Sequence, residues 1–417
     1  MPLDPSSQVG RARYMRWASH IAGSALGIFS TILGNALIFL IVARALSPSE
    51  FGKYGQAYAV CSMFGLVVDF GYPQRLLRDL PHYVAEHGNV PARILHLKLV
   101  LTALVTPVTL GLSIFLAGGA WVLGAILWVG IALISYGNFF GSVMRADGRH
   151  VRDSINLLIA NLLGAATTGI IALAPSPSPK ELALGTLVIG LTYLPLARLS
   201  ALATARIVPE PVSLAKLREE FFGGITYASD IFVARAYGFA DVILLSAMVA
   251  PASVGIYQLG QKLMQIALPF AQAFNNVLLP IFARQFHRGA QSKAASLAPI
   301  IIMGTAGLIG FLMFSLIGPL VIGLAFSPAY HPLKTLMPLF GGVILIRFIT
   351  ASLAILMTSS GMQSTRLRIN ALALITFVPS ALALSSLFGL SGMLAALIAS
   401  AALSASLYAL FIFRSSR

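Results

Sequence analysis

Long apolar stretches recur along the whole chain and constrain its fold more than any other feature. Each is roughly 20 residues long, about the length at which an α-helix crosses the hydrocarbon core of a bilayer. Only short polar segments separate them, since 58% of the 417 residues are hydrophobic and 10% are charged. The apolar residues run continuously and do not alternate as they would in a membrane β-barrel. We therefore predict an all-α integral membrane protein.

We predict about twelve transmembrane helices, at residues 20–44, 54–72, 95–117, 120–143, 154–174, 182–204, 224–248, 253–281, 297–325, 334–359, 367–388 and 390–413. With the N-terminus in the cytoplasm, twenty Lys and Arg, including Lys98, fall on the cytoplasmic side. Four fall on the outer side: Arg44, Lys53, Lys180 and Lys334. This asymmetry follows the positive-inside rule and predicts that both termini are cytoplasmic. Topology thus explains the net charge of +15, and no nucleic-acid partner is needed.

Two segments share the pattern Pro-x-x-x-Gly-x-Tyr: PSEFGKY at Pro48–Tyr54 and PASVGIY at Pro251–Tyr257. We interpret both as loops at an outer corner, each joining an odd-numbered helix to the next. A chance match is the alternative, because the chain holds 37 glycines and 22 prolines. Agreement in membrane side and helix order favours two parallel halves, a known plan for transporters. We predict a six-helix bundle at 1–205, a cytoplasmic linker at 206–223 and a second six-helix bundle at 224–417.

The chain also resembles a known family in four stretches. These are ARALSPSEFGKYGQAYAV, DFGYPQRLLRDL, ADVILLSAMVAPASVGIYQLGQKL and LLPIFARQ. They are similar to polysaccharide transporters, which are flippases for lipid-linked oligosaccharides in the multidrug/oligosaccharidyl-lipid/polysaccharide exporter superfamily. The resemblance implies two six-helix bundles around a central cavity and alternating access. It also implies a polyprenyl (pyro)phosphate-linked oligosaccharide as substrate, moved to the outer leaflet of the bacterial inner membrane for exopolysaccharide or lipopolysaccharide synthesis.

Three cations lie near the middle of predicted helices: Arg235, Lys262 and Arg347. A charge at the bilayer centre costs at least about 2.5–3.5 kcal/mol, so each requires a partner, a water-filled cavity or a path to the interface. No Asp or Glu follows Asp241 in the remaining 176 residues. A positive site with few counter-ions suits an anion such as a pyrophosphate, and we predict that these three residues bind it. Pairing with nearby carboxylates or helix C-terminal carbonyls is the alternative.

Three carboxylates are the candidate counter-ions or coupling-ion sites: Asp69, Asp230 and Asp241. A buried carboxylate can titrate, so coupling to an ion gradient (H⁺ or Na⁺) is one option and downhill substrate flux is another. Asp69 is also placed to pair with Arg75 or Arg78 as a cytoplasmic latch. A solvated carboxylate at a helix end is the alternative for Asp69.

Polar amides within the predicted helices are candidate sugar contacts. They are Asn35, Asn138, Asn161 and Gln261. In a membrane bundle such groups also form interhelical hydrogen bonds, which is the alternative. The single cysteine and the seven histidines, which form no ligand cluster, predict neither a disulfide nor a metal site, and no cofactor is expected.

Two other functions were weighed against a flippase. Catalytic signatures are absent, and a membrane glycan polymerase or glycosyltransferase would need catalytic groups on a long outer loop. The predicted outer loops are too short for this, so we do not expect an enzyme. A drug/cation antiporter of the same superfamily is the nearer alternative, although organic cations would favour an acidic cavity.

Overall fold

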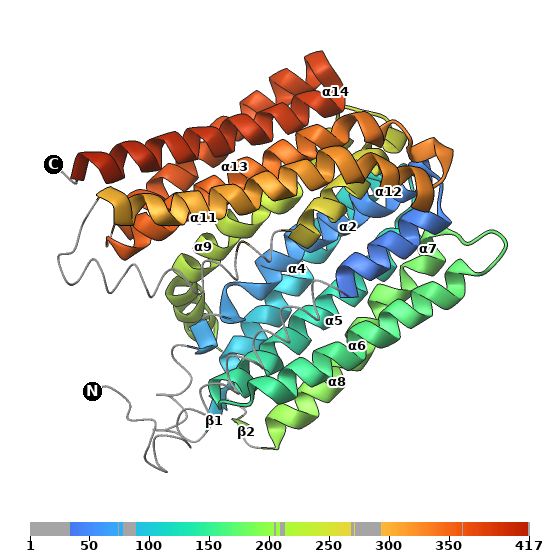
Figure 1. The fold of residues 1–417 in the computed structure, drawn as a ribbon. Helices are drawn as coiled ribbons and strands as arrows, with labels where there is room; N and C mark the ends of the chain where they lie inside the picture. Colours follow the sequence, from blue (N-terminus) through green and yellow to red (C-terminus); the bar gives the residue numbers. More distant parts are fainter. Residues whose placement is uncertain are drawn as a thin grey trace, which may run out of the picture. The chain divides into compact units, whose positions relative to one another are not determined.

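The computed structural model describes residues 34–73, 75–77, 89–203, 206–208, 213–267, 271, 293–360 and 362–415. These residues are helical almost throughout (Figure 1). The helices are Gly34–Ala45, α2 (Pro48–Asp69), α4 (Ala92–Leu116), α5 (Trp121–Ala146), α6 (His150–Ala172), α7 (Pro179–Leu182), α8 (Leu184–Leu202), α9 (Leu214–Ser246), a helix over 251–267, α11 (Lys293–Leu312), α12 (Gly318–Ala325), α13 (Leu333–Ser359) and α14 (Gln363–Ser415). A π-helical turn, Met313–Ile317, joins α11 to α12, and a 3₁₀ turn, Pro328–Tyr330, precedes α13.

Seven helical segments among the described residues are long and apolar enough to cross a membrane. α7 and α8 together form one of them, Pro179–Leu202, and the last, Ser364–Ile412, is two helices joined at a kink. At that kink Gly389 has φ 58° and ψ −130°, a backbone conformation that only glycine adopts without strain. The predicted break between residues 388 and 390 is therefore confirmed, as is the helical membrane-spanning architecture. The count of twelve helices stays a prediction.

A short strand pair was not predicted. β1 (Asn89–Pro91) pairs in parallel with β2 (Arg206–Val208), with Val90 opposite Ile207. The pair joins the segment before α4 to the segment after α8, so the fold is all-α with one small two-stranded addition.

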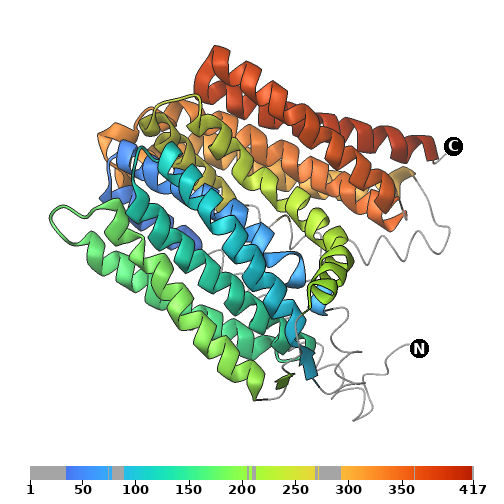
Figure 2. The ribbon, with the colours of Figure 1, turned by 180° about the vertical axis from the view of Figure 1, so that it is seen from behind.

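The described chain forms two compact units. The first comprises Met1–Ala45 and Lys53–Phe239, and the second comprises Leu46–Gly52 and Ala240–Arg417. Within the first unit, α5 packs along α8 and α4, and α6 packs on α8 (Figures 1 and 2). Within the second unit, α13 packs between α11 and α14. The predicted halves, 1–205 and 224–417, stay a prediction.

The segment at Pro48–Tyr54, predicted as a loop, is instead the start of a helix. Ser47 and Glu50 form a reciprocal capping box, because the Glu50 N–H donates to the Ser47 hydroxyl and the Ser47 N–H donates to the Glu50 carboxylate, both at 3.3 Å. Pro48 occupies the first helical position, where its missing N–H costs nothing. The loop assignment was wrong because the Ser-x-x-Glu spacing, a helix-start signal, was not recognised.

The glycines of the two Pro-x-x-x-Gly-x-Tyr segments pack against each other within the second unit. A methyl group added at Gly52 would lie 1.8 Å from the carbonyl oxygen of Pro251. One added at Gly255 would lie 2.0 Å from the carbonyl oxygen of Pro48. The contact is reciprocal, so each segment supplies both the glycine and the carbonyl that faces the other glycine. The repeated pattern therefore marks a close crossing of two helix starts that only glycine permits.

α9 begins earlier than predicted, inside the segment predicted as the cytoplasmic linker 206–223. The Ser213 hydroxyl accepts the N–H of Lys216 at 3.3 Å, which satisfies one of the free donors at the start of the helix. The first turns of α9 belong to the first unit, and the unit boundary falls between Phe239 and Ala240, inside the same helix.

Candidate functional site

A buried carboxylate, Asp241, organises a polar cluster in the second unit. Its side chain is 2% exposed and accepts hydrogen bonds from the Tyr257 hydroxyl at 2.6 Å, the Gln261 amide at 2.7 Å and the Val242 N–H at 2.8 Å. Tyr257 is the tyrosine of the second Pro-x-x-x-Gly-x-Tyr segment. The second Pro-x-x-x-Gly-x-Tyr segment therefore supplies two groups: the Tyr257 hydroxyl, which binds Asp241, and Gly255, which lies at the helix crossing.

Two of the three predicted anion-binding cations belong to this cluster. Arg347 on α13 and Lys262 on the 251–267 helix both interact electrostatically with Asp241. The Lys262 ammonium also donates to Gln265 at 3.3 Å. Among the described residues, the cluster therefore places two basic side chains beside one buried carboxylate. The sequence thus identified residues that the structure brings together, while their role in binding substrate stays a prediction.

The third predicted cation, Arg235, lies on the part of α9 that belongs to the first unit. Its side chain is exposed, in contrast to the half-buried Lys262 and Arg347. The side chain of Asp230 lies outside the described residues. A site shared by all three cations therefore stays a prediction.

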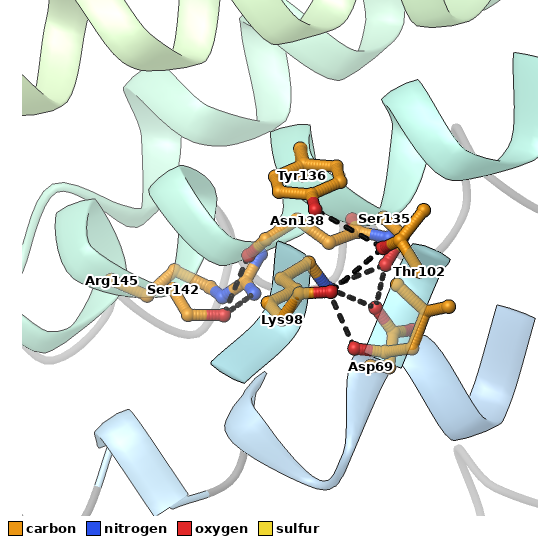
Figure 3. A network of polar contacts seen from close by, with 9 residues as sticks. Asp69, Lys98, Thr102, Ser135, Tyr136, Asn138, Ser142 and Arg145 are labelled. Carbon is orange, nitrogen blue, oxygen red and sulfur yellow. Dashed lines mark hydrogen bonds and ion pairs between the residues drawn. The ribbon is translucent and has the colours of Figure 1, made fainter. Parts of the chain in front are cut away.

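Asp69, the last residue of α2, lies in a second buried cluster, in the first unit (Figure 3). The Lys98 ammonium on α4 donates to the Asp69 carboxylate at 3.2 Å and to the Ser135 hydroxyl of α5 at 2.6 Å. Ser135 also donates to Asp69. The predicted pairing of Asp69 with Arg75 is wrong, because Asp69 turns toward the bundle interior and Lys98 satisfies it there.

Arg75 instead pairs with Glu220 near the start of α9. Glu220 is 4% exposed and accepts from Arg75 at 2.5 Å and from the Tyr72 hydroxyl at 3.4 Å, and Arg93 lies 3.3 Å from its second oxygen. Phe70 stacks on Phe221 beside this group, with ring centroids 5.1 Å apart. The predicted latch between Asp69 and Arg75 is therefore not formed, since each residue pairs with another partner, and Arg78 lies outside the described residues.

A further buried ion pair was missed by the sequence analysis. Arg145 on α5 pairs with Asp153 on α6, and the Tyr193 hydroxyl of α8 donates to the same carboxylate at 2.8 Å. Gly141 makes room, since a methyl group there would lie 2.4 Å from both Asp153 and Tyr193 oxygens. The sequence carried no signal for this pair, because Arg145 and Asp153 lie eight residues apart on two different helices.

The predicted sugar-contact amides lie mainly in packed positions. Asn35 accepts from the Tyr58 hydroxyl at 3.4 Å, and Gln261 donates to Asp241. Asn161 is 4% exposed, and a methyl group at Gly34 would lie 2.7 Å from its Cβ atom. Asn138 is half-buried on α5, where its main-chain oxygen accepts from the Ser142 hydroxyl (Figure 3). Packing within and between helices accounts for these contacts, and sugar binding by these amides stays a prediction.

Within the described residues, no three His, Cys, Asp or Glu side chains gather as a metal site would require. The polar clusters are instead cation–carboxylate groups inside helix bundles. In membrane proteins, ionisable residues in such positions mark substrate or ion pathways, or hold helices together.

Solved structures with the same fold are transporters. The chain aligns with "Inward-facing conformation of a multidrug resistance MATE family transporter of the MOP superfamily" at a TM-score of 0.73 and 14% identity, covering 95% of this chain and 98% of the other. "Lipid II flippase MurJ, inward closed conformation" aligns at 0.69 and 12% identity, covering 94% and 87%. A MOP superfamily transporter from Pyrococcus furiosus, described as having reverse polarity of its binding pocket, aligns at 0.58 and 15% identity, covering 95% of each chain.

No curated protein shows a significant sequence match to the chain. A family model, described as polysaccharide biosynthesis protein, matches residues 19–286, which is more than half of the chain. That match includes both Pro-x-x-x-Gly-x-Tyr segments, the Asp241 cluster up to Lys262 and all three residues of the Asp69 cluster. The chain shares the fold of these transporters, and it belongs to the polysaccharide biosynthesis protein family.

Proposed function

We propose that this protein is a flippase for a polyprenyl (pyro)phosphate-linked oligosaccharide. It moves this substrate by alternating access from the cytoplasmic to the outer leaflet of the bacterial inner membrane, where surface polysaccharide is assembled. The family match supports a role in polysaccharide biosynthesis, and the fold shared with transporters supports transport by alternating access. The activity is transport, driven by a coupling ion (H⁺ or Na⁺) or by downhill flux, and requires no catalytic group or cofactor.

The observation that carries the proposal is the grouping of two basic side chains around one buried carboxylate in the described part of the second unit. Lys262 and Arg347 both interact with Asp241, whose two oxygens already accept three hydrogen bonds. No other acid follows Asp241 in the sequence, so this region is rich in basic groups. A guanidinium binds phosphate oxygens through two parallel hydrogen bonds, and an ammonium adds a point charge. This combination suits a lipid-linked phosphate or pyrophosphate.

The test is flipping of a fluorescent polyprenyl-pyrophosphate oligosaccharide in proteoliposomes. Removing a charge-assisted hydrogen bond costs about 1.5–3 kcal/mol, so Arg347→Ala and Lys262→Ala should weaken substrate affinity about 10-fold or more. Arg347→Lys keeps the charge without the bidentate geometry and should fall between wild type and Arg347→Ala. Arg198→Ala is the matched control, because Arg198 is exposed on α8 near its end. Unchanged flipping by both cluster variants would remove Lys262 and Arg347 from the substrate site.

A drug/cation antiporter is the second candidate, favoured by the alignment with the multidrug transporter at a TM-score of 0.73. Its substrates are cations, which the two basic side chains beside Asp241, Lys262 and Arg347, would disfavour. Efflux of a cationic dye from cells that express the protein, with no accumulation of lipid-linked oligosaccharide in the deletion strain, would favour the antiporter. Reporter fusions check the topology, and we expect both termini in the cytoplasm and Lys334 outside.

A further inference from the structure

The Lys98 ammonium is surrounded by oxygens inside the first unit. It donates to the Val68 carbonyl at 3.2 Å, to the Asp69 carboxylate at 3.2 Å and to the Ser135 hydroxyl at 2.6 Å. The ring of Tyr136 adds a cation–π contact, with the ammonium 5.2 Å from its centroid. The Lys98 side chain is 1% exposed. An ammonium has three N–H donors, so the three oxygens satisfy it completely.

These oxygens come from a different part of the fold than the ammonium. Val68 and Asp69 end α2, Ser135 lies in the middle of α5, and the lysine reaches them from α4 (Figure 3). Ser135 also donates to Asp69, so carboxylate and hydroxyl stay together through a bond that does not involve the lysine. The end of α2 contributes the negative side of its helix dipole to the same point. The oxygens of Val68, Asp69 and Ser135 therefore form a largely buried site of negative potential, which attracts a small cation.

Their chemical types are those that hard cations prefer. A main-chain carbonyl, a carboxylate and a hydroxyl are oxygen ligands of the kind that bind alkali and alkaline-earth ions in proteins. A single carboxylate balances one positive charge, so the site is electrically neutral when a monovalent cation occupies it.

We propose that Val68, Asp69 and Ser135 form a monovalent-cation site that the chain fills with its own ammonium, Lys98. The Lys98 ammonium is covalently attached to the chain and occupies the site permanently. Asp69 is therefore the counter-ion of Lys98 and does not bind and release sodium. Removing the ammonium exposes a site for a free cation of similar size. This inference stands on contacts within the first unit and does not depend on the proposed function.

The experiment is chemical rescue of Lys98→Ala. The purified variant is melted in detergent with choline chloride, and then with methylammonium, ammonium or sodium chloride at the same ionic strength. We expect a lower Tm than wild type in choline. A saturable rise of about 2–4 °C is expected with the small cations, and none with choline, which is too large for the space. Lys180→Ala, which removes an exposed lysine, is the matched control and should show neither the loss nor the rescue.

Two further variants separate the proposal from general destabilisation. Lys98→Met keeps the aliphatic bulk of the lysine, one atom shorter, and leaves much less space for a cation than Lys98→Ala does, so its loss should be rescued far less. The double variant Asp69→Asn/Lys98→Ala removes both charges and should regain stability without any cation, even where Lys98→Ala is too unstable to purify.

Equal rescue of Lys98→Ala and Lys98→Met would show a general salt effect and overturn the proposal. No cation effect on Lys98→Ala, or a double variant no more stable than the single one, would overturn it as well.

Discussion

The crossing of the two Pro-x-x-x-Gly-x-Tyr segments predicts a sharp loss of stability when either glycine gains a methyl group. In Gly52→Ala the new carbon would lie 1.8 Å from the Pro251 carbonyl oxygen, whereas real contacts stay beyond 3.0 Å, so the backbones must separate by about 1.2 Å. The obstacle is a main-chain atom, which cannot rotate away as a side chain can. Overpacking of this kind costs roughly 1–3 kcal/mol, and the better helix propensity of Ala returns about 1 kcal/mol at most.

Gly255→Ala should behave alike, since its methyl group would lie 2.0 Å from the Pro48 carbonyl oxygen. Thermal unfolding in detergent, followed by tryptophan fluorescence, is the assay, and we expect each variant to lower Tm by several degrees. Both substitutions open the same crossing, so the double variant should lose less than the sum of the two single losses.

Gly304→Ala is the matched control for this pair of variants. Gly304 lies in α11 of the same unit, and nothing lies within 4 Å of a methyl group added there, so Tm should hold or rise. If Gly52→Ala and Gly255→Ala melt like Gly304→Ala, the two helix starts do not cross as described.

Three other variants test features of the fold through the same melting assay. Glu220→Ala leaves Arg75 and Arg93 without their shared carboxylate, and we expect a loss of about 1–3 kcal/mol; a Tm equal to wild type would show that the cluster is not formed. Gly389→Ala forces a side chain into the positive-φ kink of α14 and should cost about 1–2 kcal/mol, unless the two halves of α14 straighten into one helix. Ser47→Ala removes the cap of α2 and should cost about 1 kcal/mol, whereas Ser49→Ala, at the second position of the helix, should cost little.

The membrane-spanning helices could be predicted from the sequence because hydrophobic length alone determines them. The break at Gly389 and the bounds of α5 and α13 agree with the prediction within a few residues. Helix starts were less predictable. The predicted start of α2, residue 54, lies six residues after the observed start at Pro48. The polar residues before residue 54 resemble a loop, although Ser47 and Glu50 have capping-box spacing.

The pairing of charges could be predicted only in part. Lys262, Arg347 and Asp241 were singled out because a charge in an apolar stretch is costly wherever it points. Lys98 was assigned to the cytoplasmic side because it lies near a helix start, and only the packing of α2, α4 and α5 shows that it turns inward. Glu220 was missed because its partners, Arg75 and Arg93, lie more than a hundred residues away in the sequence.

The position of the unit boundary inside α9 decides how this chain can be cut. A fragment that ends with the predicted first half, at residue 205, would lose the part of α9 that belongs to the first unit, and with it Glu220, which pairs with Arg75 and Arg93. A fragment that begins at Lys53 would likewise deprive the second unit of Gly52. Split-protein reporters and separately expressed halves should therefore be cut at the unit boundaries and not at the middle of the sequence. The first half of the sequence contains residues 46–52 of the second unit, and the second half contains the part of α9 that belongs to the first unit.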